Sequence, residues 1–216
     1  MTDFNCLTAG LVRLLVCPAA LVFLRKKKGA LIYPAFVAYG VCVPVFLSAY
    51  FIKMGFGDTI DLAYFIKRGM LYGIFEEGAK FIALKYLYDH FNSRFDSVSY
   101  AIGHGAYEEF GAGISCLALI GTDRAAPEIF RVNLWAGVEG LAFCAAMTVI
   151  IYYGIVFEKS RYTLPAAMIL HTVSNMAGNI LKYSAAVYPV RTCMTAAVCV
   201  GAWILCWKKL KSMDGE

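Results

Sequence analysis

The sequence has few charged residues and no long polar stretch. Asp, Glu, Lys and Arg together make up 16% of the 216 residues, whereas 60% of the residues are hydrophobic. A soluble protein needs a polar face on each surface helix, and most segments of this chain lack one. The composition therefore excludes an ordinary soluble domain and predicts an integral membrane protein that is surrounded by the lipid bilayer.

Signatures of several other protein classes are also missing. The eight cysteines stand singly in the sequence without a CxxC pair, so we expect neither disulfides nor a cysteine metal cluster. There is no glycine-rich phosphate loop, and no Ser-His-Asp arrangement stands out. The net charge of +5 is small and lies in short clusters at segment ends, which indicates membrane topology rather than nucleic-acid binding.

Helix-length apolar segments predict an all-α polytopic transmembrane helical bundle of about seven spans. The segments cover residues at about 7–24, 31–52, 69–88, 97–120, 132–157, 164–182 and 186–207. No internal repeat or linker divides them, so we expect a single integral-membrane domain over 1–216, with the polar motifs at about 69–182. The first segment has no preceding basic residue and no clear cleavage motif, which favours a retained span over a signal peptide.

Two basic clusters favour one orientation in the membrane. Arg25 to Lys28 end the first segment, and Lys208, Lys209 and Lys211 follow the last. With seven spans these clusters lie on the same side, and a cytoplasmic placement leaves ten Lys and Arg residues inside and seven outside. We therefore expect a multi-pass protein of the cell or plasma membrane, with its N-terminus outside and its C-terminus in the cytoplasm.

The stretch Gly73–Tyr88, GIFEEGAKFIALKYLY, places two adjacent carboxylates in a run that otherwise suits the middle of a bilayer. An ionised carboxylate in hydrocarbon is costly, so such residues usually have a partner. Lys80 lies one helical turn from both Glu76 and Glu77. One interpretation is that the three residues only hold the helix in place. However, one Lys cannot compensate both acids, so a further partner is expected on another helix.

The fourth segment, FDSVSYAIGHGAYEEFGAGISCLALIG, is the first source of such a partner. Tyr100, His104 and Glu108 recur at every fourth residue, so they share one face of a helix. The fifth segment contains Glu139 in LWAGVEGLAFCAAM, an acid without a local partner. We expect it to find one across the bundle.

The sixth segment, LPAAMILHTVSNMAGNILK, is the second source. His171 and Asn175 lie four residues apart on one helical face, and Asn179 follows one turn later. Asn side chains often join membrane helices, and we interpret Asn179 in this way. An interhelical hydrogen bond is the alternative role for each His as well.

Three chemistries fit these side chains. In the first, a Glu is the general base for a water, a His orients the water, and His and Asn N–H groups stabilise a tetrahedral oxyanion. In the second, His104, His171 and a Glu bind zinc, although no HExxH motif places two ligands on one helix. In the third, the polar residues form a proton or ion path and nothing is cleaved.

The order of the motifs resembles that of a known family. EExxK, YxxxHG and HxxxN, each within a hydrophobic segment, resemble the CPBP/Abi superfamily of intramembrane endopeptidases, which includes the type II CAAX prenyl endopeptidases. The fuller set GIFEEGAK, GHGAYEE, GVEGLAF and ILHTVSN is most similar to its bacterial YhfC-like branch. The resemblance covers about residues 70–180, and its specificity comes from the order and spacing of all three motifs.

The resemblance implies a metal-independent, glutamic-type intramembrane protease without a cofactor. Its substrate would be a membrane-associated peptide or protein. Glu76 would activate the water that His104 holds, and His171 with Asn175 would form the oxyanion site. Glu77 with Lys80 would support Glu76. We also expect Glu108 and Glu139 to be supporting residues of the site, although the resemblance does not account for them.

The chain departs from the family pattern in two respects. The usual first motif is EExxxR, and Phe81 stands where that Arg would fall, with Lys80 one residue earlier. Glu108, Glu109 and Glu139 are acids that the prenyl endopeptidases do not require, which indicates a different substrate or a site used only for binding. The alternatives are a non-catalytic membrane protein of the same fold that binds a peptide, lipid or cation, and a zinc-dependent membrane protease.

Counting from the segment ends gives a difference in depth between the candidate residues, which opposes a common site unless helix tilt or a ragged segment end absorbs it. His104 and His171 lie about seven residues from the expected cytoplasmic side, whereas Glu76 lies about thirteen residues from it. At ~1.5 Å per residue, the difference corresponds to roughly 9 Å along the membrane normal.

Overall fold

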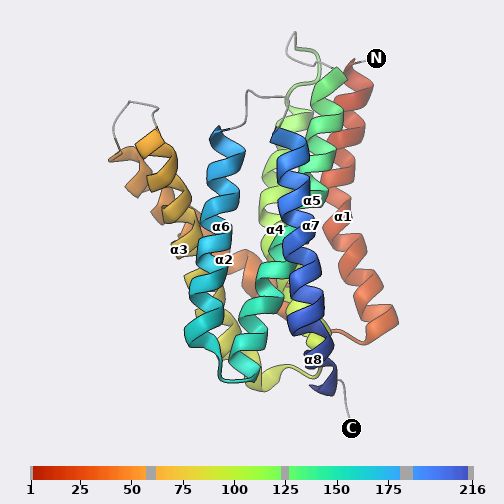
Figure 1. The fold of residues 1–216 in the computed structure, drawn as a ribbon. Helices are drawn as coiled ribbons and strands as arrows, with labels where there is room; N and C mark the ends of the chain where they lie inside the picture. Colours follow the sequence, from red (N-terminus) through yellow and green to blue (C-terminus); the bar gives the residue numbers. More distant parts are fainter. Residues whose placement is uncertain (1, 57–61, 123–126, 181–186, 214–216) are drawn as a thin grey trace.

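The computed structural model is a bundle of long helices that run between two common ends (Figure 1). It describes residues 2–56, 62–122, 127–180 and 187–213. The long helices are α1 (Thr2–Lys28), α2 (Tyr33–Met54), α3 (Leu62–Leu87), α4 (Arg94–Leu117), α5 (Pro127–Val156), α6 (Ser160–Ile180) and α7 (Val187–Ala202). Short turns follow α3 (η1, Tyr88–His90) and α7 (η2, Trp203–Trp207; α8, Lys208–Leu210; η3, Lys211–Met213). The predicted all-α helical bundle is confirmed.

Four of the described helical stretches are long and apolar enough to cross a membrane on their own. They are Asp3–Lys28, Tyr33–Met54, Gly137–Val156 and Pro189–Leu210. Helices α3, α4 and α6 have 26, 24 and 21 residues and carry the polar motifs. At ~1.5 Å per residue each of these is also long enough for a hydrocarbon core of about 30 Å. Helix α3 packs against α6 and α2, and α4 packs against α1, α2 and α5, so the polar helices lie among the apolar ones.

Helices α4 and α6 begin earlier than their apolar residues predict, at Arg94 and Ser160 instead of about 97 and 164. Helix α4 starts with a capping box. The Ser93 side chain accepts a hydrogen bond from the backbone N–H of Phe95, and the Asp96 carboxylate accepts one from the backbone N–H of Ser93 at 3.0 Å. A polar first turn of this kind does not contribute to an apolar run, and for that reason the sequence pattern misses it.

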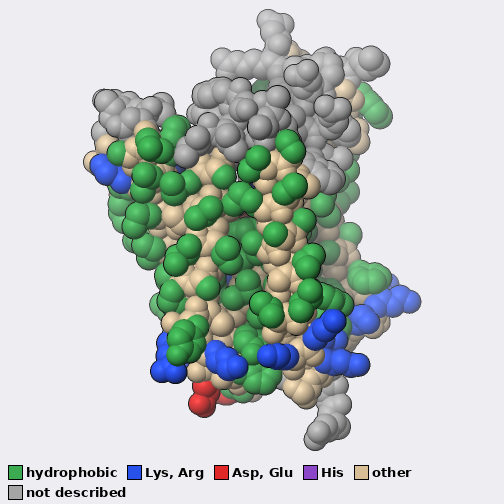
Figure 2. Space-filling model, in the orientation of Figure 1, with side chains coloured by type: hydrophobic (Ala, Val, Ile, Leu, Met, Phe, Trp, Pro, Cys, Tyr) green, Lys and Arg blue, Asp and Glu red, His purple; other side chains and the backbone are tan. Residues whose placement is uncertain are grey.

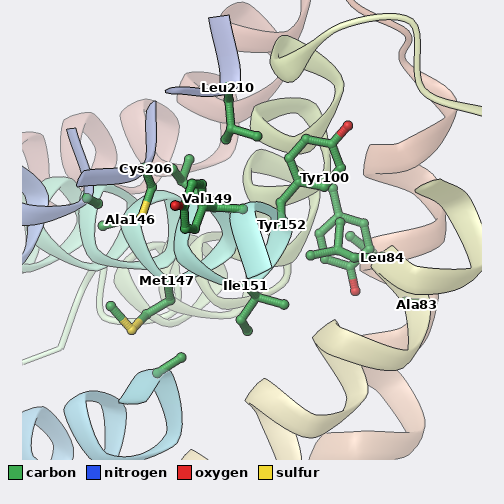
Figure 3. Close-up of a cluster of buried hydrophobic side chains, with 14 of the residues drawn as sticks. Ala83, Leu84, Tyr100, Ala146, Met147, Val149, Ile151, Tyr152, Cys206 and Leu210 are labelled. Carbon is green, nitrogen blue, oxygen red and sulfur yellow. The ribbon is translucent and has the colours of Figure 1, made fainter. Parts of the chain in front are cut away.

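The apolar core lies where α3, α4, α5 and the C-terminal turns meet, as Figure 3 shows. Leu84, Met147 and Tyr152 are fully buried there. Tyr100, which shares a helical face with His104 in the sequence, belongs to this core. Its buried hydroxyl has no hydrogen-bond partner within the described part of the chain. Tyr100 therefore belongs to the apolar core beside the site and does not line the cavity.

Both basic clusters lie at the same end of the bundle. Figure 1 places the end of α1 and the C-terminal turns at this end, and Figure 2 shows Lys and Arg side chains gathered there. The Lys28 ammonium is 5.3 Å from the centroid of the Phe95 ring, and the Arg94 guanidinium donates a hydrogen bond to the Trp207 carbonyl at 2.9 Å. The start of α4 therefore joins the end of α1 to the C-terminal turns.

Candidate functional site

Helix α3 approaches α6 closely because a glycine lies at their contact. A Cβ added to Gly73 would be 2.8 Å from the Met168 carbonyl oxygen and 3.0 Å from the Thr172 backbone nitrogen. Such distances leave no room for a side chain, so the two backbones can approach only because residue 73 is glycine. The close contact brings His171, which directly precedes Thr172, next to the two acids that follow Gly73 by one helical turn.

Glu77 is completely buried and fully engaged. The Lys80 ammonium donates to its Oε1 at 2.8 Å and to its Oε2 at 3.1 Å, and Nδ1 of His171 lies 2.6 Å from Oε1. A carboxylate that is paired with an ammonium only accepts hydrogen bonds, so Nδ1 of His171 carries a proton and donates it to Glu77. Glu77 thus joins Lys80, on its own helix, to His171 on α6 through hydrogen bonds.

The contacts of Glu76 with other described residues are longer. Its Oε2 is 3.4 Å from Nε2 of His104 and 3.8 Å from Nε2 of His171, and the residue is 3% exposed. The structure thus brings Glu76, His104 and His171 within the expected water-bridged distance. We refer to Glu76, Glu77, Lys80, His104 and His171 as the polar cluster.

The three residues lie at nearly the same depth in their helices. Glu76 lies 11 residues before the last residue of α3, and His104 and His171 lie 10 and 11 residues after the first residues of α4 and α6. The predicted depth difference is wrong, because the apolar pattern placed the starts of α4 and α6 too late.

A cavity of about 90 Å³ adjoins the polar cluster. All eight site residues expected from the sequence line it: Glu76, Glu77, Lys80, His104, Glu108, Glu139, His171 and Asn175. Phe143 of α5 forms part of the wall, with its ring centroid 5.7 Å from that of His171 in an edge-on arrangement. A polar cavity of this size has room for several water molecules with hydrogen-bond partners on its walls.

A second cavity of about 250 Å³ adjoins the first. The two share Glu76, Glu108, His171 and Asn175, and the second is completed by Phe46, Arg68 and Tyr72. The sequence placed Arg68 before the third span, but the residue lies within α3, with its guanidinium 5.8 Å from the centroid of the Tyr72 ring. The site thus continues from the polar cluster toward a basic and aromatic wall.

Glu139 finds its partners on α7. The Thr192 hydroxyl donates a hydrogen bond to its Oε1, and Nε of Arg191 lies 4.0 Å from its Oε2. The expectation that this acid is compensated across the bundle is confirmed. Arg191 and Thr192 themselves were not selected from the sequence, where they stand near the start of an otherwise apolar segment.

One group of described side chains is arranged so that it could hold a cation. Glu76, His104 and Glu108 each offer one ligand atom, and these atoms lie within 4.8 Å of one another. The zinc set considered from the sequence combined His104 with His171. In the structure His171 directs Nδ1 to Glu77, and Glu108 is the third member instead.

Cys42 on α2 was not selected from the sequence as a residue of the site. Its Sγ lies 3.2 Å from Nδ1 of His104, and the residue is fully buried. A single cysteine in an apolar helix looks the same whether it fills space or binds a polar group, so no sequence signal could have identified it. The side chain of Asn179, the remaining residue singled out in the sequence, lies outside the part of the chain whose side chains are described.

No family model, curated protein sequence or solved structure matches this chain. The fold and the site define its class as an all-helical protein that has helices long and apolar enough to cross a membrane and ionisable residues around an internal cavity. Its function must be argued from that site.

Proposed function

We propose that this protein is an intramembrane endopeptidase in which Glu76 activates a water molecule without a metal. The position of Glu76 is the observation that carries this proposal. Its carboxylate lies 3.4 and 3.8 Å from two imidazoles, beside a cavity with room for water. A general base needs this arrangement, an acceptor within reach of a water that other groups orient. The motif order that resembles the CPBP/Abi superfamily supports the same assignment.

In the proposed reaction, Glu76 takes a proton from the water while the water oxygen forms a bond to the peptide carbonyl carbon. The carbonyl oxygen becomes negatively charged, and N–H groups of His171 and Asn175 stabilise it. Glu76 then gives its proton to the amide nitrogen as the C–N bond breaks. The products are a carboxylic acid and an amine, and the Glu76 carboxylate is regenerated.

The charges of the polar cluster support the role of His171. The carboxylates of Glu76 and Glu77 and the Lys80 ammonium together carry one net negative charge. A doubly protonated His171 balances this charge. One of its N–H groups is bound by Glu77 at 2.6 Å. The other faces the cavity next to Glu76, where it can donate to a developing oxyanion.

A cleavage assay with the full-length protein in lipid nanodiscs tests the proposal, using a panel of prenylated and unmodified membrane peptides. Glu76→Gln should lower kcat by roughly 10²–10⁴-fold, because it removes the proton acceptor. Glu109→Gln is the control, since this buried acid pairs with Arg13 away from the polar cluster. Full activity in Glu76→Gln would exclude the mechanism. Tight binding of a peptide, lipid or cation with no cleavage by the wild type would favour the non-catalytic alternative.

A zinc-dependent peptidase is the second candidate, supported by the closeness of Glu76, His104 and Glu108. Histidine and carboxylate ligands are typical of catalytic zinc, which supplies an activated water. Glu108→Gln separates the two candidates because it removes a zinc ligand and leaves the proposed base intact. Activity that survives Glu108→Gln and a chelator supports the metal-free reaction. Loss of activity together with loss of measured zinc supports the second candidate.

We also propose that the basic end of the bundle faces the cytoplasm in a cell or plasma membrane. Arg25 to Lys28 end α1 at this end, Lys208, Lys209 and Lys211 lie in the C-terminal turns beside them, and basic clusters of this kind favour the cytoplasmic side. A reporter fused after Lys211 should report a cytoplasmic location in intact cells, whereas a signal from the opposite side would reverse the orientation.

A further inference from the structure

In the proposed reaction Nε2 of His104, which lies 3.4 Å from Oε2 of Glu76, orients the water that Glu76 activates, and its other ring nitrogen has no role. Nδ1 faces Cys42 of α2, whose Sγ is 3.2 Å away and lies 3.9 Å from the His104 backbone carbonyl oxygen. We propose that Cys42 is a positioning residue that keeps the His104 proton on Nε2, where it faces Glu76. The catalytic consequence of this arrangement rests on the proposed function, whereas the position of the proton does not.

Two arrangements of protons are chemically consistent, because a neutral imidazole has one donor and one acceptor nitrogen. In the first, the Cys42 thiol donates to Nδ1, and Nε2–H of His104 donates toward Glu76. In the second, Nδ1–H donates to the sulfur and the thiol donates to the backbone carbonyl. Nε2 then presents a lone pair to the Glu76 carboxylate.

The contacts favour the first arrangement. It assigns the thiol proton to the shorter of its two contacts, 3.2 Å rather than 3.9 Å. It also gives the ionised Glu76 a charge-assisted hydrogen bond, which is stronger than one between neutral groups. The second arrangement uses sulfur, a weak acceptor, and places two acceptor atoms 3.4 Å apart.

The packing of α2 explains why a cysteine can make this contact. The buried residues of α2 are all small: Pro34, Ala35, Ala38, Cys42 and Ala49. A Cβ added to Gly103 of α4 would overlap the backbone of Ala35, so α2 and α4 touch directly beside His104. Cys42 is the one residue in this set whose side chain can donate a hydrogen bond.

Cys42 lies behind the imidazole and outside the substrate space. It is 0% exposed and does not line either cavity at the polar cluster. It therefore does not contact the reacting atoms. Its effect is to present a donor nitrogen of His104 to the water that Glu76 activates. Without the thiol proton, His104 can adopt the Nδ1–H form, which presents a lone pair to the same water.

Nitrogen-15 NMR of the histidine-labelled protein tests this proposal without any activity assay. The chain has only three histidines, and a His104→Gln variant identifies the signals of His104. The wild type and Cys42→Ser, which retains a donor, should show the Nε2–H form. Cys42→Ala should show a mixture or the Nδ1–H form, and Cys17→Ala is the control at another buried cysteine. An Nδ1–H form in the wild type, or an unchanged Nε2–H form in Cys42→Ala, would overturn the proposal.

Cleavage kinetics test the catalytic consequence. Cys42→Ala should lower kcat by roughly 10–100-fold, the range found when the hydrogen-bond partner of a metal-binding histidine is removed. KM should stay near the wild-type value, and Cys42→Ser should restore kcat. A tautomer shift in Cys42→Ala with unchanged kcat would overturn the catalytic role of Cys42. If the tautomer shifts and the wild type cleaves no peptide, the proposed function fails while the positioning of His104 stands.

Discussion

Helix α4 contributes to two groups of buried charged side chains, and the two groups differ in the number and type of their residues. In one place His104 joins the polar cluster between α3 and α6. In the other, Glu109 accepts a hydrogen bond from the Arg13 guanidinium of α1 at 3.2 Å, and both side chains are 7% exposed. Burial alone therefore does not distinguish a functional site from a structural ion pair.

The number of partners and the adjoining space do distinguish them. The Arg13–Glu109 pair joins one cation to one anion, and the residues around its cavity of about 390 Å³ are otherwise apolar. The polar cluster contains two acids, one Lys and two His, and it adjoins a cavity with polar walls. An ion pair in which one cation neutralises one anion, such as Arg13–Glu109, can only stabilise the contact between α1 and α4. The polar cluster has more acids than Lys residues and adjoins a cavity that can hold water, so its side chains can also transfer protons.

The largest expected effect comes from removing the cation in each place. Lys80→Met leaves Glu77 without its ammonium, and Arg13→Met leaves Glu109 without its guanidinium. Each should cost about 3–5 kcal/mol of stability, measured by denaturation in detergent, because an uncompensated charge stays buried. At a temperature where both variants are folded, only Lys80→Met should lose cleavage activity. An equal loss of activity in Arg13→Met would break the comparison.

The second effect concerns catalysis without a change in charge. Asn175→Ala removes one proposed oxyanion donor, so kcat should fall by about 10²–10³-fold while KM and stability change little. Asn179→Ala, one turn further along α6, is the control, and it should cost about 1 kcal/mol of stability with activity retained. If Asn175→Ala and Asn179→Ala lose the same stability and both keep their activity, Asn175 contributes to helix packing and not to catalysis.

The third effect is smaller and concerns the contact that assembles the polar cluster. Gly73→Ala forces α3 away from α6, which should cost about 1–3 kcal/mol and lengthen the Glu77–His171 hydrogen bond. Activity should fall with it. Gly111→Ala is the control, because no side chain or neighbouring helix among the described residues lies within 4 Å of the added methyl group, and it should raise stability by about 0.5–1 kcal/mol. Wild-type stability and activity in Gly73→Ala would show that the helices can separate without consequence.

The smallest effect on activity is expected when the Arg13–Glu109 pair is replaced completely. The double variant Arg13→Met/Glu109→Leu should match the wild type in stability or exceed it by about 1–4 kcal/mol, because both desolvated charges disappear. Its kcat and KM should be unchanged in the cleavage assay. A marked loss of activity would connect this pair to the site and remove the distinction drawn here.

The sequence by itself determined the class of the protein and the local part of the site. Long apolar segments require helices in a bilayer, since only internal hydrogen bonds satisfy the backbone there. The spacing places Lys80 one helical turn from both Glu76 and Glu77, and the structure pairs it with Glu77. The need of buried acids for partners also indicated that Glu139 would be compensated from another helix.

Only the tertiary structure decided which partners these residues have. His171 binds Glu77 through Nδ1 because Gly73 lets α6 approach α3, and Cys42 faces His104 because small residues let α2 approach α4. The common depth of Glu76 and the two imidazoles depends on polar helix starts that an apolar pattern does not include. Contacts between residues far apart in the chain are set by how closely the backbones pack, and spacing within a single helix carries no information about that distance.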